Sequence, residues 1–89
     1  MLEQDIEIIN KLGLHARAAA KLVSTAASYA CRVQLDFGGK QADAKSIMAV
    51  MMLAAAKGSL ITIRCEGEDE KNAMDAVIEL IDSYFGEDG

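Results

Sequence analysis

The chain has 89 residues, of which 52% are hydrophobic, and this length accommodates one domain (residues 1–89) with a single core. No apolar run reaches the roughly 18 residues of a membrane span, and the acidic, alternating N-terminus does not resemble a secretory signal. We therefore expect a cytoplasmic protein that does not enter a membrane.

The net charge of −5 is unevenly spread: residues 58–89 contain two Lys or Arg and nine Asp or Glu, whereas residues 1–57 contain seven and five. This acidic balance argues against nucleic-acid binding. We interpret the acidic end as a solvating surface, while the more basic half could dock an acidic or phosphorylated protein.

The first third of the chain predicts a strand, a loop and a helix. Residues 2–9 alternate between apolar and polar side chains, with Ile6 and Ile8 on the covered face of a strand. Residues 10–14 form a loop. From residue 16 to about residue 29, apolar residues recur at helical spacing, which predicts an amphipathic helix.

A hairpin and a second helix follow. Residues 31–37 alternate most clearly and predict a strand. Gly38-Gly39 predicts a hairpin turn into a short strand that ends at residue 42 or 44. Ser46 is expected to be the N-cap of a helix that extends from Ile47 to about Ala55.

The last third predicts a strand and a helix. Lys57-Gly58 has the cation-then-glycine pattern of a helix end, and residues 59–66 alternate as a further strand. Acidic residues 68–70 suit the first turn of a final helix, which Gly86 is expected to end. The apolar stripe of this helix consists of Ala73, Val77, Leu80, Ile81 and Tyr84.

The order β-α-β-β-α-β-α with short hairpins predicts an α+β fold, in which helices pack on one face of a four-stranded antiparallel sheet. Cys31 and Cys65 fall at apolar positions of strands, and we interpret both as small buried hydrophobes. A disulfide, a metal pair with His15 or a reactive thiol are weaker alternatives, because neither cysteine has the spacing of metal ligands.

The helix predicted from Ile47 is apolar on every side. A short helix on a small domain leaves part of its surface in solvent, so some of Met48, Met51 and Met52 are expected to be exposed. Exposed methionine suits adaptable docking with more than one partner. Deeper burial of the same helix is an equal alternative.

His15 is the only histidine in the chain, and it lies between the first predicted strand and the first predicted helix. The first amides of a helix lack internal partners and carry positive dipole charge, and Arg17 adds a guanidinium nearby. Together these groups form a place that can hold a phosphoryl group. Alone, His15 would be interpreted as a helix-cap or surface residue and Arg17 as a solvated charge.

A resemblance to a known family rests on two segments, Gly13-Leu14-His15-Ala16-Arg17 and Ala44-Lys45-Ser46-Ile47-Met48-Ala49-Val50-Met51. The first is similar to the phosphohistidine segment, and the second to the regulatory serine segment, of the histidine-containing phosphocarrier (HPr) family of the bacterial phosphotransferase system. The resemblance extends over essentially the whole chain. It implies an open-faced β-sandwich with three helices on one face of the sheet, in agreement with the pattern above.

The resemblance also implies a carrier protein that is not itself an enzyme. His15 is expected to accept a phosphoryl group on Nδ1 from enzyme I, with Arg17 helping to hold it, and to pass it to an enzyme IIA-type protein. No cofactor or metal ion is implied. We expect a monomer.

Regulation and docking are implied in the same way. Ser46 matches the residue that a dedicated kinase, HPr kinase/phosphorylase, phosphorylates to weaken transfer, although a plain N-cap is an alternative. Ala18 stands where the family commonly has proline, so a looser helix start is expected. The docking surface of the family corresponds to Ala16, Arg17, Ala20, Ile47, Met48 and Met51.

Two questions of function stay open at this point. The chain is similar to proteobacterial members of the family that serve sugar transport and also to those of a nitrogen-related regulatory branch. The alternative to a carrier is a regulatory binding module whose phosphorylation state controls docking without onward transfer.

Overall fold

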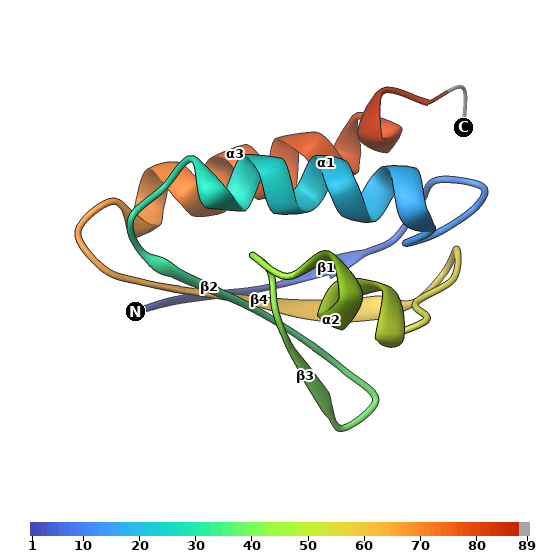
Figure 1. The fold of residues 1–89 in the computed structure, drawn as a ribbon, viewed down its shortest axis with the longest axis horizontal. Helices are drawn as coiled ribbons and strands as arrows, with labels where there is room; N and C mark the ends of the chain where they lie inside the picture. Colours follow the sequence, from blue (N-terminus) through green and yellow to red (C-terminus); the bar gives the residue numbers. More distant parts are fainter. Residues whose placement is uncertain (88–89) are drawn as a thin grey trace.

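The structure is a computed structural model that describes residues 1–87, and it contains a four-stranded antiparallel sheet with three helices on one face (Figure 1). The strands are β1 (Leu2–Glu7), β2 (Arg32–Phe37), β3 (Lys40–Asp43) and β4 (Leu60–Glu66). The helices are α1 (Ala16–Ala27), α2 (Ile47–Met52) and α3 (Glu70–Asp82). The predicted fold, with the order β-α-β-β-α-β-α, is confirmed.

The strands lie in the order β1-β4-β2-β3, so that β4 is hydrogen-bonded to both β1 and β2. β2 and β3 form the predicted hairpin, with Phe37 opposite Lys40. Gly38 and Gly39 occupy its turn with φ values of 57° and 82°. Two positive φ values in a two-residue loop match the twist of the flanking strands, which is why glycines suit this turn.

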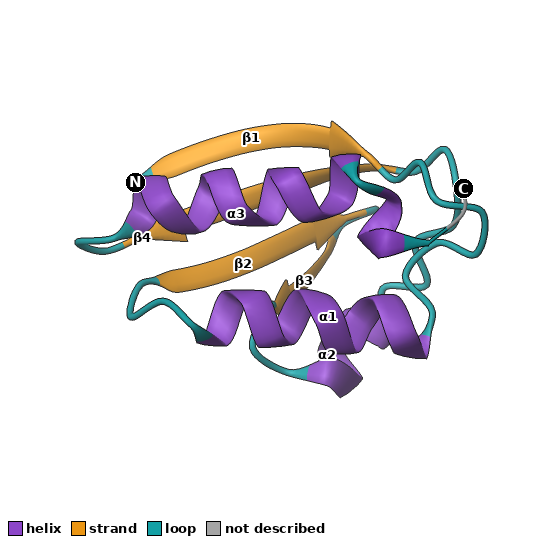
Figure 2. Cartoon of the chain, turned by 90° about the horizontal axis from the view of Figure 1, so that it is seen from above, coloured by secondary structure: helices purple, strands orange, loops and turns teal. Residues whose placement is uncertain are grey.

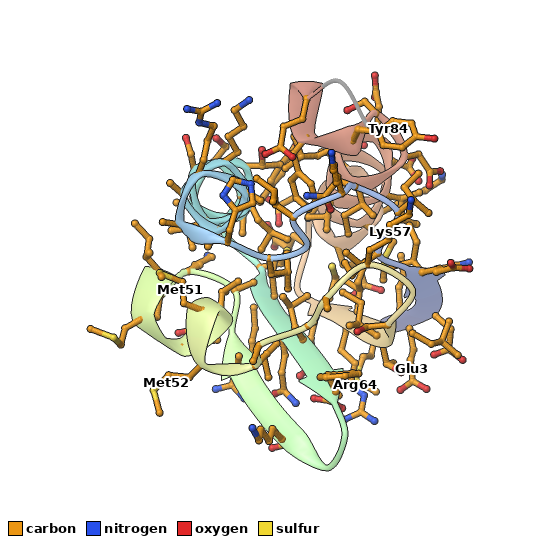
Figure 3. All side chains as sticks on the ribbon, turned by 90° about the vertical axis from the view of Figure 1, so that its right-hand side faces the viewer. Glu3, Met51, Met52, Lys57, Arg64 and Tyr84 are labelled. Atoms are coloured by element: carbon orange, nitrogen blue, oxygen red, sulfur yellow. The ribbon has the colours of Figure 1, made fainter. Side chains whose placement is uncertain are left out.

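The two faces of the sheet differ in polarity. The side chains toward the helices are apolar and buried, and they include Val33, Leu35, Ile61, Ile63 and Cys65. On the opposite face, Arg64 lies between two carboxylates: its Nε is 2.8 Å from Glu3 Oε2, and its Nη1 is 2.7 Å from Asp36 Oδ2 (Figure 3). Charged pairs cover this open face, whereas the helices cover the apolar one.

The helices lie side by side over the sheet (Figure 2). α3 packs against β1 and β4, α1 lies between α3 and α2, and α2 reaches β3. The buried face of α1 consists of Ala18, Ala19, Leu22 and Ala26. Because three of these are alanines, α1 can lie close to its neighbours. None of the helices among residues 1–87 is long and apolar enough to cross a membrane.

α2 ends earlier than the sequence predicts. It ends at Met52 and not near Ala55, because Ala54 adopts a positive φ of 54°. The chain then turns toward the loop before α1, where the carbonyl of buried Ala55 accepts a hydrogen bond from Leu14 N (2.9 Å). The prediction that Lys57-Gly58 marks the helix end is therefore wrong.

The end of α3 also differs from the prediction. α3 ends at Asp82, and Tyr84–Gly86 form a single 3-10 turn. Tyr84 and Phe85 both have positive φ values, of 60° and 54°, which take the chain off the helical course. As a result Tyr84, predicted on the apolar stripe, is exposed (40%), and Phe85 is fully buried in its place.

Both cysteines are buried and free, which confirms their interpretation as small hydrophobes. Burial raises the pKa of the Cys65 thiol to about 11, and burial also raises the pKa of Cys31. Both thiols are therefore protonated at neutral pH, a state that disfavours reaction as a nucleophile.

Candidate functional site

His15 is the N-cap residue of α1. Its backbone is extended (φ −75°, ψ 179°), and its carbonyl accepts the first helical hydrogen bond from Ala19 N (2.8 Å). The His15 side chain makes no capping hydrogen bond to the amides of this helix N-terminus. The imidazole therefore lies beside backbone donors at the positive end of the helix dipole, as predicted.

The loop before α1 fixes the place of His15. Gly13 has φ of 65°, and a Cβ added to it would lie 2.5 Å from Ala55 O. Only glycine allows this approach, which brings Leu14 N to within 2.9 Å of the same oxygen. Leu14 itself is buried, so the residue next to His15 is anchored in the core.

The His15 ring contacts the C-terminal segment. Its Nε2 lies 2.6 Å from Glu87 Oε2, and the side chains are 26% and 13% exposed. Asn10 Nδ2 donates to Glu87 Oε1 (3.1 Å) and to Gly13 O (2.8 Å). No hydrogen bond joins Nδ1 of His15 to any residue among 1–87. The two ring nitrogens thus have different surroundings.

A lysine of α1 holds the C-terminal segment in this place. Lys21 Nζ donates a hydrogen bond to Phe85 O (2.6 Å), and Glu87 N donates to Tyr84 O (2.9 Å). Figure 1 shows this segment, in red, at the same end of the molecule as the light-blue loop before α1. The turn after α3 therefore returns Glu87 to the start of α1.

Two opposing effects act on the pKa of Glu87. Burial raises the pKa of this carboxyl, whereas hydrogen bonds from His15 and Asn10 and the charges of His15 and Lys21 lower it. The lowering effects prevail, so the pKa of Glu87 lies below its ordinary value. Glu87 is therefore a carboxylate at neutral pH.

A shallow depression surrounds His15 and is lined by Lys11, Leu12, His15, Ala16, Arg17, Lys21, Gly86 and Glu87. Three of these residues are cations. Arg17 is exposed, and among residues 1–87 no hydrogen bond or ion pair occupies its guanidinium. Across the same residues no three His, Cys, Asp or Glu side chains form a group that could hold a metal ion. The depression suits an anion brought to the ring from solvent.

Ser46 is the N-cap of α2, as predicted. Its Oγ accepts a hydrogen bond from Ala49 N (3.3 Å), and the residue is half-buried. The neighbouring Lys45 donates from Nζ to Tyr29 O (2.7 Å), just beyond the end of α1. Lys45 thus places its positive charge at the C-terminal end of α1.

The residues that the resemblance assigns to docking are exposed on two helices that pack against each other, α1 and α2. Ala16, Arg17 and Ala20 lie on α1, and Ile47, Met48 and Met51 lie on α2. Met48 is 71% and Met52 69% exposed, and Figure 3 shows Met51 and Met52 extending outward from α2. The expected exposure of methionines is confirmed.

The sequence interpretation missed Asn10 and Glu87. It treated the acidic C-terminal end as a solvating surface, which is wrong for Glu87, while Asp88 lies outside the described residues. No local pattern connects Glu87 with His15, because the contact spans 72 positions. The available hint was Phe85-Gly86, an aromatic anchor followed by a residue that permits a turn.

Comparisons with known proteins agree with this geometry. Residues 2–83 match the family described as PTS HPr component phosphorylation site. The phosphocarrier protein HPr of Cupriavidus necator is 55% identical over 87 residues, which cover 98% of each chain. The phosphocarrier protein NPr of Shewanella violacea is 41% identical over 86 residues, covering 97% of this chain and 94% of that protein.

A crystal structure of HPr from Thermoanaerobacter tengcongensis covers 100% of both chains with a TM-score of 0.96 and 43% sequence identity. The fold and these matches define a phosphocarrier of the phosphotransferase system. The chain belongs to the HPr family, so the resemblance stated from the two motifs is confirmed.

Proposed function

We propose that this protein receives a phosphoryl group on His15 Nδ1 from the phosphohistidine of enzyme I and donates it to an enzyme IIA-type protein in the cytoplasm. The observation that carries the proposal is the position of His15, at the start of α1 with one ring nitrogen bonded to Glu87 and the other without a partner among residues 1–87. Both transfers require only that a second protein reach this open depression.

The chemistry requires little beyond positioning and charge compensation. The phosphorus–nitrogen bond of the donor histidine breaks as a bond to Nδ1 forms, and the charge of the transferred group develops near cations. Arg17 and Lys21 line the depression, and the α1 N-terminus contributes its amides and dipole. Since the donor is already an activated phosphoramidate, no general base is needed on this chain.

The proposed docking surface is the exposed apolar patch of α2 with the adjoining side of α1. Ile47, Met48 and Met51 are exposed, and unbranched methionine side chains can adapt to two different partners at the same surface. We further propose that a kinase phosphorylates Ser46 and so adds charge at the edge of this patch. The HPr relative at 55% identity, against 41% for NPr, favours the sugar-transport branch.

The experiment that tests the carrier function is intact-mass analysis after incubation with enzyme I and phosphoenolpyruvate. Wild type is expected to gain one acid-labile phosphate and His15→Ala none, while Arg17→Ala gains it more slowly. Subsequent incubation with candidate IIA proteins is expected to remove the phosphate. Absence of a gain in wild type with active enzyme I would refute the carrier function, and a gain that no acceptor removes would favour the regulatory module.

A further inference from the structure

We propose that Glu87 is a positioning residue for transfer at His15: its carboxylate accepts a hydrogen bond from Nε2–H and thereby leaves Nδ1 as the ring nitrogen with the lone pair. This inference rests on the proposed function of His15. It assigns the C-terminal segment a role in phosphoryl transfer. Neither partner docking nor charge compensation by the cations of the depression requires that role.

The direction of the hydrogen bond follows from the chemistry of its two ends. A carboxylate is an acceptor only, whereas a neutral imidazole has one donor nitrogen and one acceptor nitrogen. The 2.6 Å contact between Nε2 and Oε2 therefore holds its hydrogen on Nε2. In a neutral ring the other nitrogen, Nδ1, must then be unprotonated. An unprotonated nitrogen is what a nucleophilic attack on phosphorus requires.

Three separate contacts hold the carboxylate in place. Asn10, which is fully buried, donates from Nδ2 to Glu87 Oε1 and to Gly13 O. Lys21 Nζ fixes the carbonyl of Phe85, and the ring of Phe85 is buried in the core. The carboxylate is thus oriented from the loop before α1, from α1 and from the core, which limits rotation of the His15 ring to which it is bonded.

The same hydrogen bond compensates charge during transfer. When Nδ1 bonds to phosphorus, the proton stays on Nε2, so the ring gains a formal positive charge while the departing donor ring keeps the electron pair of the broken bond. No proton is released in this step. A carboxylate already bonded to Nε2–H stabilises that charge without moving, as the buried aspartate does for the histidine of a serine-protease triad.

Cationic side chains near Glu87 offset the repulsion between its carboxylate and an incoming phosphoryl dianion. Lys11, Arg17 and Lys21 line the depression together with Glu87, and among residues 1–87 these and His15 are its titratable lining residues. Glu87 bonds to Nε2, not to the nitrogen that receives phosphorus. The Glu87 carboxylate therefore lies on the side of the ring away from the reacting nitrogen.

The test uses three full-length variants. Glu87→Ala removes the acceptor, Glu87→Gln keeps a neutral acceptor, and Glu68→Gln is the matched control, because Glu68 is exposed in the turn before α3 and carries the same charge. We expect kcat of enzyme I for the carrier to fall by up to about 100-fold in Glu87→Ala, the loss that misplacement of a reacting group can cause, less in Glu87→Gln and not at all in Glu68→Gln. KM is expected to stay near the wild-type value.

A spectroscopic readout separates positioning from folding or docking. Because His15 is the only histidine, nitrogen-15 spectra of the labelled ring in unphosphorylated protein report on it alone. Wild type is expected to show a slowly exchanging Nε2–H and an unprotonated Nδ1, and Glu87→Ala is expected to lose the slow exchange. A rise in KM alone, or wild-type kcat and spectra in Glu87→Ala, would overturn this inference while leaving phosphorylation of His15 intact. Failure of wild type itself to be phosphorylated would instead overturn the proposed function.

Discussion

Replacing Gly13 with alanine tests how the loop holds His15 at the start of α1. An added Cβ would lie 2.5 Å from Ala55 O and 2.8 Å from Ala56 Cα, both backbone atoms that cannot move aside alone. The two segments must separate, and Leu14 N loses its bond to Ala55 O. Left-handed alanine costs roughly 1–2 kcal/mol, and a buried amide without a partner costs about 1–3 kcal/mol. We expect Gly13→Ala to lower the free energy of unfolding by about 2–5 kcal/mol.

Gly38 provides the matched control. Its φ of 57° is close to the 65° of Gly13, but nothing lies within 4 Å of the position of its Cβ. Urea unfolding of Gly38→Ala is expected to report only the backbone cost, roughly 1–2 kcal/mol. Phosphorylation by enzyme I is expected to slow in Gly13→Ala but not in Gly38→Ala, because only the former displaces His15. Equal losses of stability in the two variants would refute the role assigned to the Ala55 contact.

Three further substitutions test other parts of the molecule. Ser46→Asp keeps an oxygen for the N-cap but adds negative charge beside the exposed methionines. The rate of phosphoryl acceptance is therefore expected to fall by roughly fivefold, which corresponds to about 1 kcal/mol in the activation free energy. Unchanged kinetics would contradict a regulatory role. Hydrogen bonds from the backbone of Ala30 and from Cys31 lower the pKa of Asp69 despite its partial burial. Its carboxylate therefore stabilises the fold above the unfolded pKa of roughly 3.9, and that contribution is lost as pH falls through the lower folded pKa. In a plot of unfolding free energy against pH, Asp69→Asn is expected to lose less stability at acid pH than wild type does. A curve parallel to that of wild type would contradict the role assigned to Asp69. Phe85→Ala leaves a cavity at a fully buried position, and urea unfolding is expected to show a loss of about 3–5 kcal/mol in the free energy of unfolding. A loss below about 1 kcal/mol would be inconsistent with the packing described.

Local periodicity was sufficient to predict the elements but not where two of the helices end. The three alternating runs became β1, β2 and β4, the strand predicted after the Gly38-Gly39 turn became β3, and the Ser46 cap was correctly placed at the start of α2. Alanines 54–56 favour helix intrinsically, yet α2 ends before them because Ala55 O bonds to Leu14 N, a contact between distant segments. Tertiary hydrogen bonding therefore overrides propensity at this point.

The candidate site shows the same division between local and distant information. His15 and Arg17 lie within one motif at a helix start, so their proximity could be predicted from the sequence, and both line the depression. Asn10 and Glu87 take part through bonds to each other and to His15, and they depend on the turn that positive φ values at Tyr84 and Phe85 produce. Acidic residues near the end of a chain have no periodicity, so the only hint that Glu87 returns to His15 was the preceding Phe85-Gly86 pair.

Ala18 stands where the family commonly has proline, and the contacts around it determine how firmly the start of α1 is held. Ala18 is fully buried in the first turn of α1, and a looser start was expected in the absence of a rigid residue. The backbone before His15 is instead restrained by the Asn10 bond to Gly13 O and by the approach of Gly13 to Ala55. These contacts precede the helix and act on the segment that carries the imidazole. A proline at Ala18 would accordingly reduce the conformational entropy of the unfolded chain more than it would reposition the nitrogen that reacts.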